Sequence, residues 1–156
     1  MLKANFITAQ EAAEKIQDGS ILCTIGMTLV SASESILKAI EKRFETVGHP
    51  ADITLVHSCG QSDRKDGIQH LAHEGLVKRI VGSHWGLQPR WMEMIANSQV
   101  EAYCLPQGQI AQLYRSMACG LPGKMSKVGL GTFIDPRVEG GKMNDRTKPL
   151  PDLVDI

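Results

Sequence analysis

The stretch Ser20-Ile-Leu-Cys-Thr-Ile25 is apolar, ends at Gly26 and predicts a buried β-strand. The next predicted element is an amphipathic helix from Ser33 to Phe44, which Gly48-His-Pro50 terminates. A second apolar run, Ile53-Thr-Leu-Val-His57, then predicts another strand. Strand, helix and strand in this order form the repeating unit of a parallel α/β sheet. This unit decides the fold class, and the rest of the chain extends it.

Further elements of the same two kinds are predicted on either side of this unit. Upstream, Thr8 and Glu11 have the spacing of a capping box and predict the start of a short helix. Downstream, the pattern predicts strands over residues 77–81, 100–105 and 127–130, and helices over residues 70–74, 89–97 and 109–118. We therefore expect an α/β protein with an open, mostly parallel sheet and helices on both faces, in three αβα layers.

Each informative loop of the chain directly follows a predicted strand. These loops are Gly26-Met27-Thr28, Ser58-Cys59-Gly60, Ser83-His84-Trp85 and Pro106-Gln107-Gly108. Because the carboxyl ends of parallel strands lie at one edge of the sheet, we expect the four loops to gather there. Ligands of open α/β sheets bind in the crevice that such loops form.

The composition excludes several classes of function. The 156 residues carry a formal net charge of zero and only 4% aromatic residues, so neither a nucleic acid nor an anionic membrane is an expected partner. The start, Met1 to Asn5, has no apolar leader, and we expect a cytoplasmic protein. The four cysteines form no C-x-x-C pair and are interpreted as free, buried thiols. The spacing of His57, His70 and His73 fits no standard metal site, so we expect solvated loop histidines and no metal.

The run Val128-Gly-Leu-Gly-Thr-Phe-Ile-Asp-Pro-Arg-Val-Glu-Gly-Gly-Lys-Met-Asn144 contains four glycines and one proline. Such a run is not the interior of a helix or strand, and we expect a shaped loop that lets the backbone approach a ligand. Together with Leu105-Pro-Gln-Gly-Gln-Ile-Ala-Gln-Leu-Tyr-Arg115, it resembles the family I coenzyme A transferases, especially those of the propionate/acetate type.

The resemblance extends from about Ile7 to Asn144. The matching motifs, in the order of the family, are His84-Trp85-Gly86, Pro106-Gln107-Gly108, Arg115, Gly120-x-Pro122-Gly123 and Gly129-x-Gly131-Thr132-Phe133-Ile134-Asp135-Pro136-Arg137. The segment from His73 to Arg79 also looks like the family. One loop departs from the pattern, because Leu29, Val30 and Ser33 stand where the family has Gly, Asn and Pro.

The resemblance implies an enzyme that moves CoA between short-chain carboxylic acids through a glutamyl-CoA thioester. The substrate is then an acyl-CoA thioester, and no cofactor is expected to be bound. In the family, the nucleophilic glutamate lies in the second half of the enzyme, outside this chain. We therefore expect no catalytic residue in this chain, which should be inactive when alone. Its partner is expected to be the missing second half or another subunit, and the enzyme is expected to be oligomeric.

The residues expected to contact substrate lie in the post-strand loops and in the glycine-rich loop. They are Gly26, Met27, Ser58, Gln107, Gly108, Gly131 and Thr132, with Cys59 and His84 added as further lining residues. Gln107 offers both a donor and an acceptor to a carboxylate, and the glycines permit close approach of the backbone. The segment Asp135-Pro136-Arg137 is interpreted as a structural turn.

Residues 1–144 are interpreted as one incomplete α/β domain, and residues 145–156 as a polar tail that leads into the remainder. Two other functions stay open. The chain could be a non-catalytic acyl-CoA-binding or assembly subunit, with Leu29 and Val30 filling part of the pocket. It could also be an enzyme like the sugar-phosphate isomerases, for which Thr28 and Ser31 supply fragments of a phosphate-binding loop.

Overall fold

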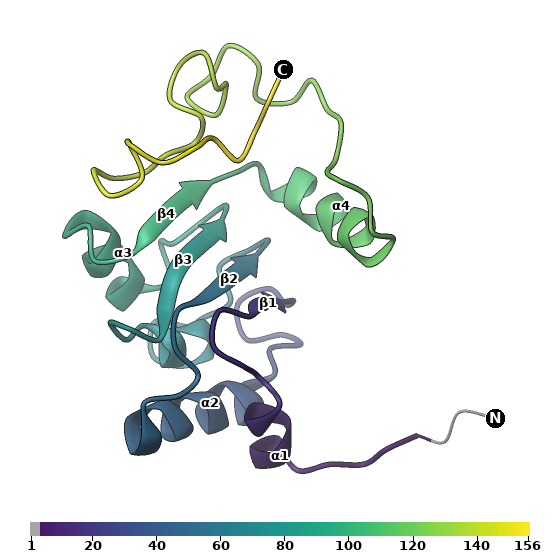
Figure 1. Cartoon of the computed structure of the whole chain (residues 1–156), viewed down its shortest axis with the longest axis vertical. Coiled ribbons are helices and arrows are strands. Elements are labelled where there is room, and N and C mark those ends of the chain that lie inside the picture. Colours follow the sequence, from purple (N-terminus) through teal and green to yellow (C-terminus); the bar gives the residue numbers. More distant parts are fainter. Residues whose placement is uncertain (1–3) are drawn as a thin grey trace.

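The computed structural model describes residues 4–156 and shows an α/β fold around a four-stranded sheet (Figure 1). Residues 1–3 lie outside the described residues. They belong to the predicted domain and to the N-terminal segment for which no apolar leader is expected. The elements are α1 (Ala9–Glu14), β1 (Ile21–Thr24), α2 (Glu34–Val47), β2 (Ile53–His57), the 3₁₀ helix η1 (Gly67–Leu71), β3 (Val77–Gly82), α3 (Pro89–Ala96), β4 (Glu101–Cys104) and α4 (Gln107–Ala118).

The four strands are parallel and lie in the sheet in chain order, β1-β2-β3-β4. Consecutive strands are therefore neighbours, and each is joined to the next by a crossover that carries a helix. The parallel α/β sheet predicted from the alternation of elements is confirmed.

Successive residues of the strands supply two separate cores, one on each face of the sheet. Leu55, Ile80 and Ala102 point into the larger core, with buried residues of α1, α2, η1 and α3. Their neighbours Val56, Val81 and Tyr103 point into a smaller core, which Ile110 and Tyr114 of α4 and residues of the C-terminal segment complete. Helices therefore lie on both faces, as predicted (Figure 1).

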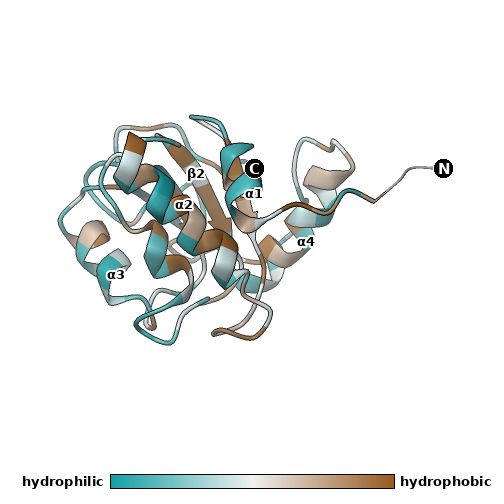
Figure 2. Cartoon of the chain, turned by 90° about the horizontal axis from the view of Figure 1, so that it is seen from below, coloured by the Kyte–Doolittle hydropathy of each residue, from teal (hydrophilic) through white to brown (hydrophobic). Residues whose placement is uncertain are grey.

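The helix boundaries follow from local chemistry. Thr8 caps α1 and forms the predicted capping box with Glu11. Helix α2 ends at Gly48, whose φ of 72° provides the left-handed C-cap. Hydrophobic and hydrophilic residues alternate along α2 in Figure 2, as expected for a helix with one face on the core.

Two elements predicted from the sequence differ from those in the structure. The strand predicted over residues 127–130 is a turn, because Gly129 and Gly131 take φ values of 99° and 74° that a strand does not allow. Val128 and Leu130 are exposed there and contribute nothing to a core. The helix predicted over residues 70–74 is the 3₁₀ helix η1, which begins and ends three residues earlier.

The segment after α4 contains no helix or strand but packs back along β4. Lys142 forms an isolated bridge with Tyr103, and the Cys104 N–H donates to Gly141 O at 2.8 Å. The Asn144 amide donates to the carbonyls of Ile95 and Val100. The polar tail also makes contact, since Tyr103 Oη donates to Pro151 O. Between residues 4 and 156, no helix combines the length and the apolar character needed to cross a bilayer.

Candidate functional site

The loops that follow the four strands meet at the carboxyl edge of the sheet. The Thr28 N–H donates to Gly60 O at 3.1 Å, which joins the loops after β1 and β2. Ser83 Oγ donates to Ser58 O at 2.5 Å, which joins the loops after β2 and β3. Gln107, after β4, borders the same hollow as Ser83. The predicted convergence of these loops is confirmed.

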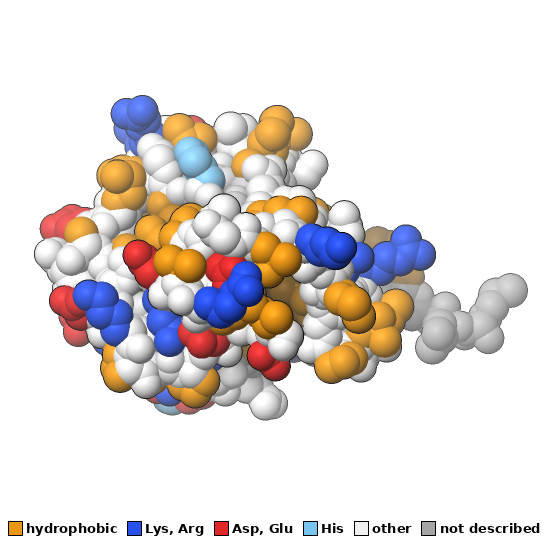
Figure 3. Space-filling view, turned by 90° about the horizontal axis from the view of Figure 1, so that it is seen from above, with side chains coloured by type: hydrophobic (Ala, Val, Ile, Leu, Met, Phe, Trp, Pro, Cys, Tyr) orange, Lys and Arg blue, Asp and Glu red, His pale blue; other side chains and the backbone are white. Residues whose placement is uncertain are grey.

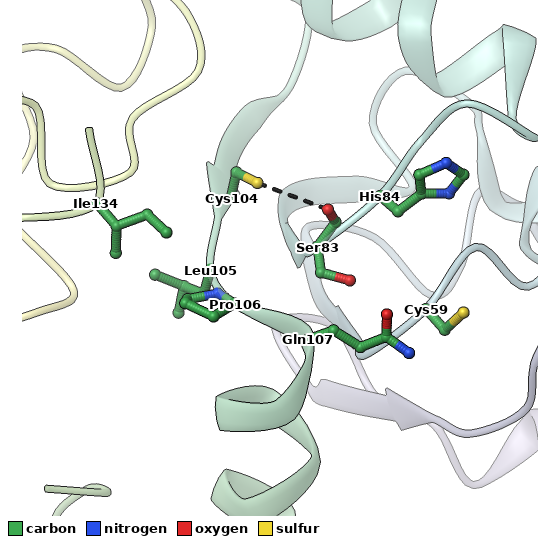
Figure 4. A pocket seen from close by; sticks show the side chains of 8 residues that line it. All are labelled: Cys59, Ser83, His84, Cys104, Leu105, Pro106, Gln107 and Ile134. Carbon is green, nitrogen blue, oxygen red and sulfur yellow. Dashed lines mark hydrogen bonds between the residues drawn. The ribbon is translucent and has the colours of Figure 1, made fainter. Parts of the chain in front are cut away.

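A hollow of about 530 Å³ lies between these loops and the glycine-rich segment. Its lining residues are Cys59, Ser83, His84, Cys104, Leu105, Pro106, Gln107 and Ile134 (Figure 4). Leu105, Pro106 and Ile134 form an aliphatic wall, and the polar groups come from the loops after β2 and β3 and from the start of α4. The hollow thus combines an apolar surface with a few polar groups, as small-molecule sites do.

Some polar groups of the hollow are already used by the protein. The Ser83 hydroxyl donates to Ser58 O, and the Cys104 thiol lies 3.7 Å from Ser83 O (Figure 4). Within residues 4–156, no protein group forms a hydrogen bond with the side chains of His84 or Gln107. The imidazole and the amide, like the thiol of Cys59, can therefore bind a ligand without breaking a contact in the fold.

His57 holds the backbone of Cys59, one of the lining residues of the hollow. Its side chain is fully buried, and its Nδ1 lies 2.7 Å from Cys59 O. Because a carbonyl only accepts, Nδ1 carries the proton and donates it to this bond. The pKa of His57 is lowered to about 4, chiefly by burial and to a smaller extent by the nearby His84, while the bond to Cys59 opposes the shift. The ring packs directly against Gly82 and edge-on to Trp85.

A buried glutamine connects the same loops. With its amide oriented to satisfy both neighbours, Gln88 donates to His84 O at 3.0 Å and accepts from Gln61 N at 3.2 Å. Gln61 in turn donates to Thr24 O at 2.8 Å. Neither His57 nor Gln88 was singled out as a site residue in the sequence, because their importance depends on burial that no local pattern reveals.

The residues predicted to contact substrate are divided by the structure into two groups. Cys59, His84 and Gln107 line the hollow. Six others, Gly26, Met27, Ser58, Gly108, Gly131 and Thr132, lie in the converging loops or the glycine-rich segment but are not among its lining residues. Lining residues that were not predicted, such as Cys104 and Ile134, occupy apolar positions that resemble core residues in the sequence.

The loop after β1 forms a tight turn away from the hollow. Met27 and Val30 pair in an isolated bridge, and a methyl group on Gly26 would lie 2.8 Å from Val30 O. Val30 is 68% exposed, and neither it nor Leu29 lines the hollow. Thr28, which was considered for phosphate binding, is also absent from the lining. No observation here favours a filled pocket or a phosphate-binding loop.

The glycine-rich segment is organised around the buried side chain of Asp135. Arg137 donates to this carboxylate from Nε and Nη2, and the Gly131 N–H donates at 2.7 Å. These bonds, those of the Arg137 side chain foremost, hold the pKa of Asp135 well below its ordinary value. The geometry agrees with the structural turn predicted for this motif. The turn also presents Ile134 to the hollow.

The prediction that His57, His70 and His73 are solvated loop residues is wrong, since His57 is buried in β2 and the other two are paired with carboxylates. His70 lies between Glu34 and Glu41 of α2, with its Nε2 at 2.8 Å from Glu34, and His73 Nε2 lies 2.8 Å from Glu41. Two groups of three side chains bring potential metal ligands within 4.8 Å of one another: Glu34, Asp66 and His70, and Glu41, Glu45 and His73. Apart from Glu45, which forms no ion pair in the described chain, these side chains belong to an ion-pair network.

Comparisons with known proteins agree with one another. Residues 6–153 match the family model described as Coenzyme A transferase. The chain is 41% identical over 154 residues to the caffeate CoA-transferase of Acetobacterium woodii, covering 98% of this chain and 29% of the relative. It is 38% identical over 144 residues to the acetate CoA-transferase YdiF of Escherichia coli K12, covering 91% and 27%.

Solved structures give the same result. The structure of YdiF from E. coli O157:H7 described as a thioester complex with CoA superposes with a TM-score of 0.87 and 36% identity, over 96% of this chain and 29% of that chain. The apoenzyme of the same protein gives a TM-score of 0.86 over 96% and 30%. This chain therefore spans less than a third of the length of the curated relatives named above.

Proposed function

The chain belongs to the coenzyme A transferase family, and from this premise we propose that it forms the amino-terminal part of an acyl-CoA:carboxylate CoA-transferase for short-chain acids. The observation that carries the proposal is the convergence of the loops after β2, β3 and β4 on one hollow with an aliphatic wall and the free side chains of His84 and Gln107. An acyl-CoA thioester is the substrate, no resident cofactor is needed, and the enzyme works in the cytoplasm.

The chemistry we propose is covalent catalysis by a glutamate supplied from outside this chain. Its carboxylate attacks the thioester carbonyl, CoA leaves as a thiolate, and a mixed anhydride forms. The thiolate attacks the glutamyl carbonyl, which releases the first carboxylate and gives glutamyl-CoA. The acceptor carboxylate repeats the two steps in reverse order, which forms the new acyl-CoA and regenerates the glutamate. Both anhydrides must be protected from water.

This chain contributes the surface against which that glutamate acts. Gln107 presents an amide to the substrate carboxylate, and Leu105, Pro106 and Ile134 exclude water from the acyl group. The loops nearby, which carry Gly26, Met27, Ser58, Gly108, Gly131 and Thr132, complete the binding surface when the remainder of the enzyme closes over it. Cys59 borders the hollow as a contact residue and has no proposed covalent role.

The uncovered parts of the fold support a missing partner. Strand β1 lies at the edge of the sheet, and Ile21 is 62% exposed, whereas the C-terminal segment covers the edge at β4. Beyond α4, Leu121 and Met125 are 57% and 95% exposed, and Figure 3 shows hydrophobic side chains on the side of the molecule where α4 lies. Such apolar surface requires cover, which the second half of the enzyme or a partner subunit, within an oligomer, provides.

The experiment compares this chain alone with the transferase completed by the second half, using propionyl-CoA and acetate. We expect acetyl-CoA to form only with the completed enzyme, and hydroxylamine to inactivate it after incubation with acyl-CoA by cleaving glutamyl-CoA. Chromatography of the acyl-CoA products measures the transfer. Turnover by the 156-residue chain alone would place the nucleophile in this chain and contradict the proposal.

A further inference from the structure

The geometry points to His84 as a carboxylate-binding residue, whose ring is positioned by two glycines, Gly60 and Gly86. This inference rests on the proposed transferase function and deepens it, because it names a residue of this chain that binds the acceptor acid. His84 lines the hollow from the loop between β3 and α3 (Figure 4).

Two glycines make room for the imidazole. A methyl group on Gly60 would lie 2.7 Å from His84 Nδ1 and 2.9 Å from the side-chain amide of Gln88. A methyl group on Gly86 would lie 2.9 Å from His84 Nε2 and 3.2 Å from Cε1. Real side chains do not approach this closely, so any other residue at either position would displace the ring. Neither glycine has a positive φ, so the space for the ring, and not the backbone conformation, explains both.

The backbone that carries the ring is anchored on both sides. Gln88 is fully buried and donates to His84 O at 3.0 Å. Ser83, the preceding residue, donates from Oγ to Ser58 O, and Trp85, the following residue, is 8% exposed. His84 itself is exposed to the hollow. Because the backbone is anchored, the loop itself loses little freedom when the ring binds a ligand.

The free groups of the hollow match a carboxylate. A carboxylate has only acceptors, and both the imidazole and the primary amide can donate. Among the other lining side chains, the hydroxyl of Ser83 and the thiol of Cys104 face backbone oxygens, and the thiol of Cys59 is only a weak donor. An acid that enters along the aliphatic wall can therefore place a carboxylate oxygen against the His84 ring. The acceptor carboxylate is the charged end of the substrate, so His84 affects chiefly the binding of the free acid.

The test is the steady-state kinetics of the completed transferase, with acetate and propionyl-CoA varied independently. We expect His84→Phe to raise KM for acetate about ten- to a hundredfold, since one hydrogen bond to a charged group is lost. KM for propionyl-CoA and kcat should change much less, which separates lost binding from general damage. His84→Gln retains a donor and should recover part of the affinity. An unchanged KM for acetate in His84→Phe would overturn the inference.

The glycines provide a second and independent test. Gly60→Ala and Gly86→Ala push on opposite sides of the ring, and each should raise KM for acetate. The double variant Gly60→Ala/His84→Phe should be no worse than His84→Phe alone, because both changes remove the same contact. The matched control is Gly123→Ala, where a methyl group meets nothing within 4 Å and the wild-type KM is expected. Additive effects in the double variant would refute the role of Gly60.

The failure of this inference is distinguishable from the failure of the proposed function. If the completed wild-type protein transfers no CoA, the proposed function is wrong, and the inference falls with it. If the wild type is active and His84→Phe binds acetate normally, only the assignment of His84 is wrong. Thermal unfolding of each variant, compared with Gly123→Ala, shows whether a loss of affinity follows from a loss of folded protein.

Discussion

His57 and His70 show how position in the fold gives opposite properties to the same side chain. Burial is the main cause that lowers the pKa of His57 to about 4. The pKa of His70 is raised, because the bonds to Glu41 and Glu34 outweigh its partial burial. With a carboxylate at each ring nitrogen, His70 must donate from both, so it is bound as the imidazolium.

The buried His57 predicts a stability that falls in mild acid. Between its ordinary pKa of 6.5 and the lowered value of about 4, the unfolded chain binds a proton that the folded chain excludes. The contribution of neutral His57 to the free energy of unfolding is therefore fully present above pH 6.5. It declines as the pH falls toward 4, by about 3 kcal/mol in all. His57→Asn keeps a donor for Cys59 O and does not titrate. Urea unfolding from pH 7 to pH 4 should show a steeper loss for the wild type, and parallel profiles would contradict this account.

Helices α2 and η1 are joined by an ion-pair network that centres on Glu41. Its two oxygens accept from His70 and His73, and Arg90 of α3 lies 3.5 Å away. These bonds hold the pKa of Glu41 below its ordinary value in spite of its burial. The network therefore connects three elements on one face of the sheet and supports the segment that follows the Ser58-Cys59-Gly60 loop.

At the scale of these elements, we expect Glu41→Gln to lower the free energy of unfolding by about 1–3 kcal/mol near pH 6. The pKa of His70 is raised in the folded protein, so the stabilisation by its ion pair with Glu41 is complete below pH 6.5. This stabilisation disappears as the pH rises through the raised pKa of His70. The difference between variant and wild type should therefore shrink at pH 9. Glu45→Gln is the control, because Glu45 is exposed on the same helix and forms no ion pair within 4.0 Å in the described chain. An equal effect of the two variants would exclude the network as the cause.

The turn around Asp135 is a second element whose stability depends on one carboxylate. Asp135→Asn removes the charge that Arg137 and the Gly131 N–H stabilise, so we expect faster amide hydrogen exchange at Gly131 and in its neighbours. The pKa of Asp135 is lowered, so the turn should loosen in the wild type only as the pH falls into strong acid. Asp145→Asn, which removes an exposed pair with Lys148, should leave this exchange unchanged. Equal protection in both variants would show that the turn is held by other contacts.

The sheet as a whole has one covered edge, at β4, and one exposed edge, at β1. The C-terminal segment bridges to β4 through Lys142, but the outer edge of β1 pairs with no strand among residues 4–156. The residues of β1 alternate between exposed and half-buried, whereas β2 is almost entirely buried. A bare edge with apolar side chains is a template for association with another strand.

At the scale of the molecule, we expect the isolated chain to self-associate through β1. Ile21→Lys should shift sedimentation toward the monomer, because a charge on an edge strand opposes pairing. The thermal midpoint should change little, since Ile21 is 62% exposed. Met92→Lys is the control: it adds the same charge on α3 at a side chain that is 52% exposed. Association that persists equally in both variants would locate the contact elsewhere.

The order and kind of the main elements could be predicted from the sequence because hydrophobic periodicity and capping are local. The capping box at Thr8, the end of α2 at Gly48 and the start of α3 at Pro89 all depend on residues a few positions apart. The strand predicted over residues 127–130 failed because its apolar residues have no core to face in the folded chain. Apolar character alone does not distinguish a buried strand from an exposed turn.

By itself, the sequence determined the parallel α/β fold, the coenzyme A transferase family and the position of the informative loops after the strands. All three depend on the order and spacing of residues along the chain. Only the tertiary structure decided which loop residues line the hollow. Gly60 and Gly86 enclose His84, His57 supports Cys59 and Ile134 arrives from the far end of the chain. Such contacts depend on packing between segments that are distant in sequence, and packing is a property of the folded molecule as a whole.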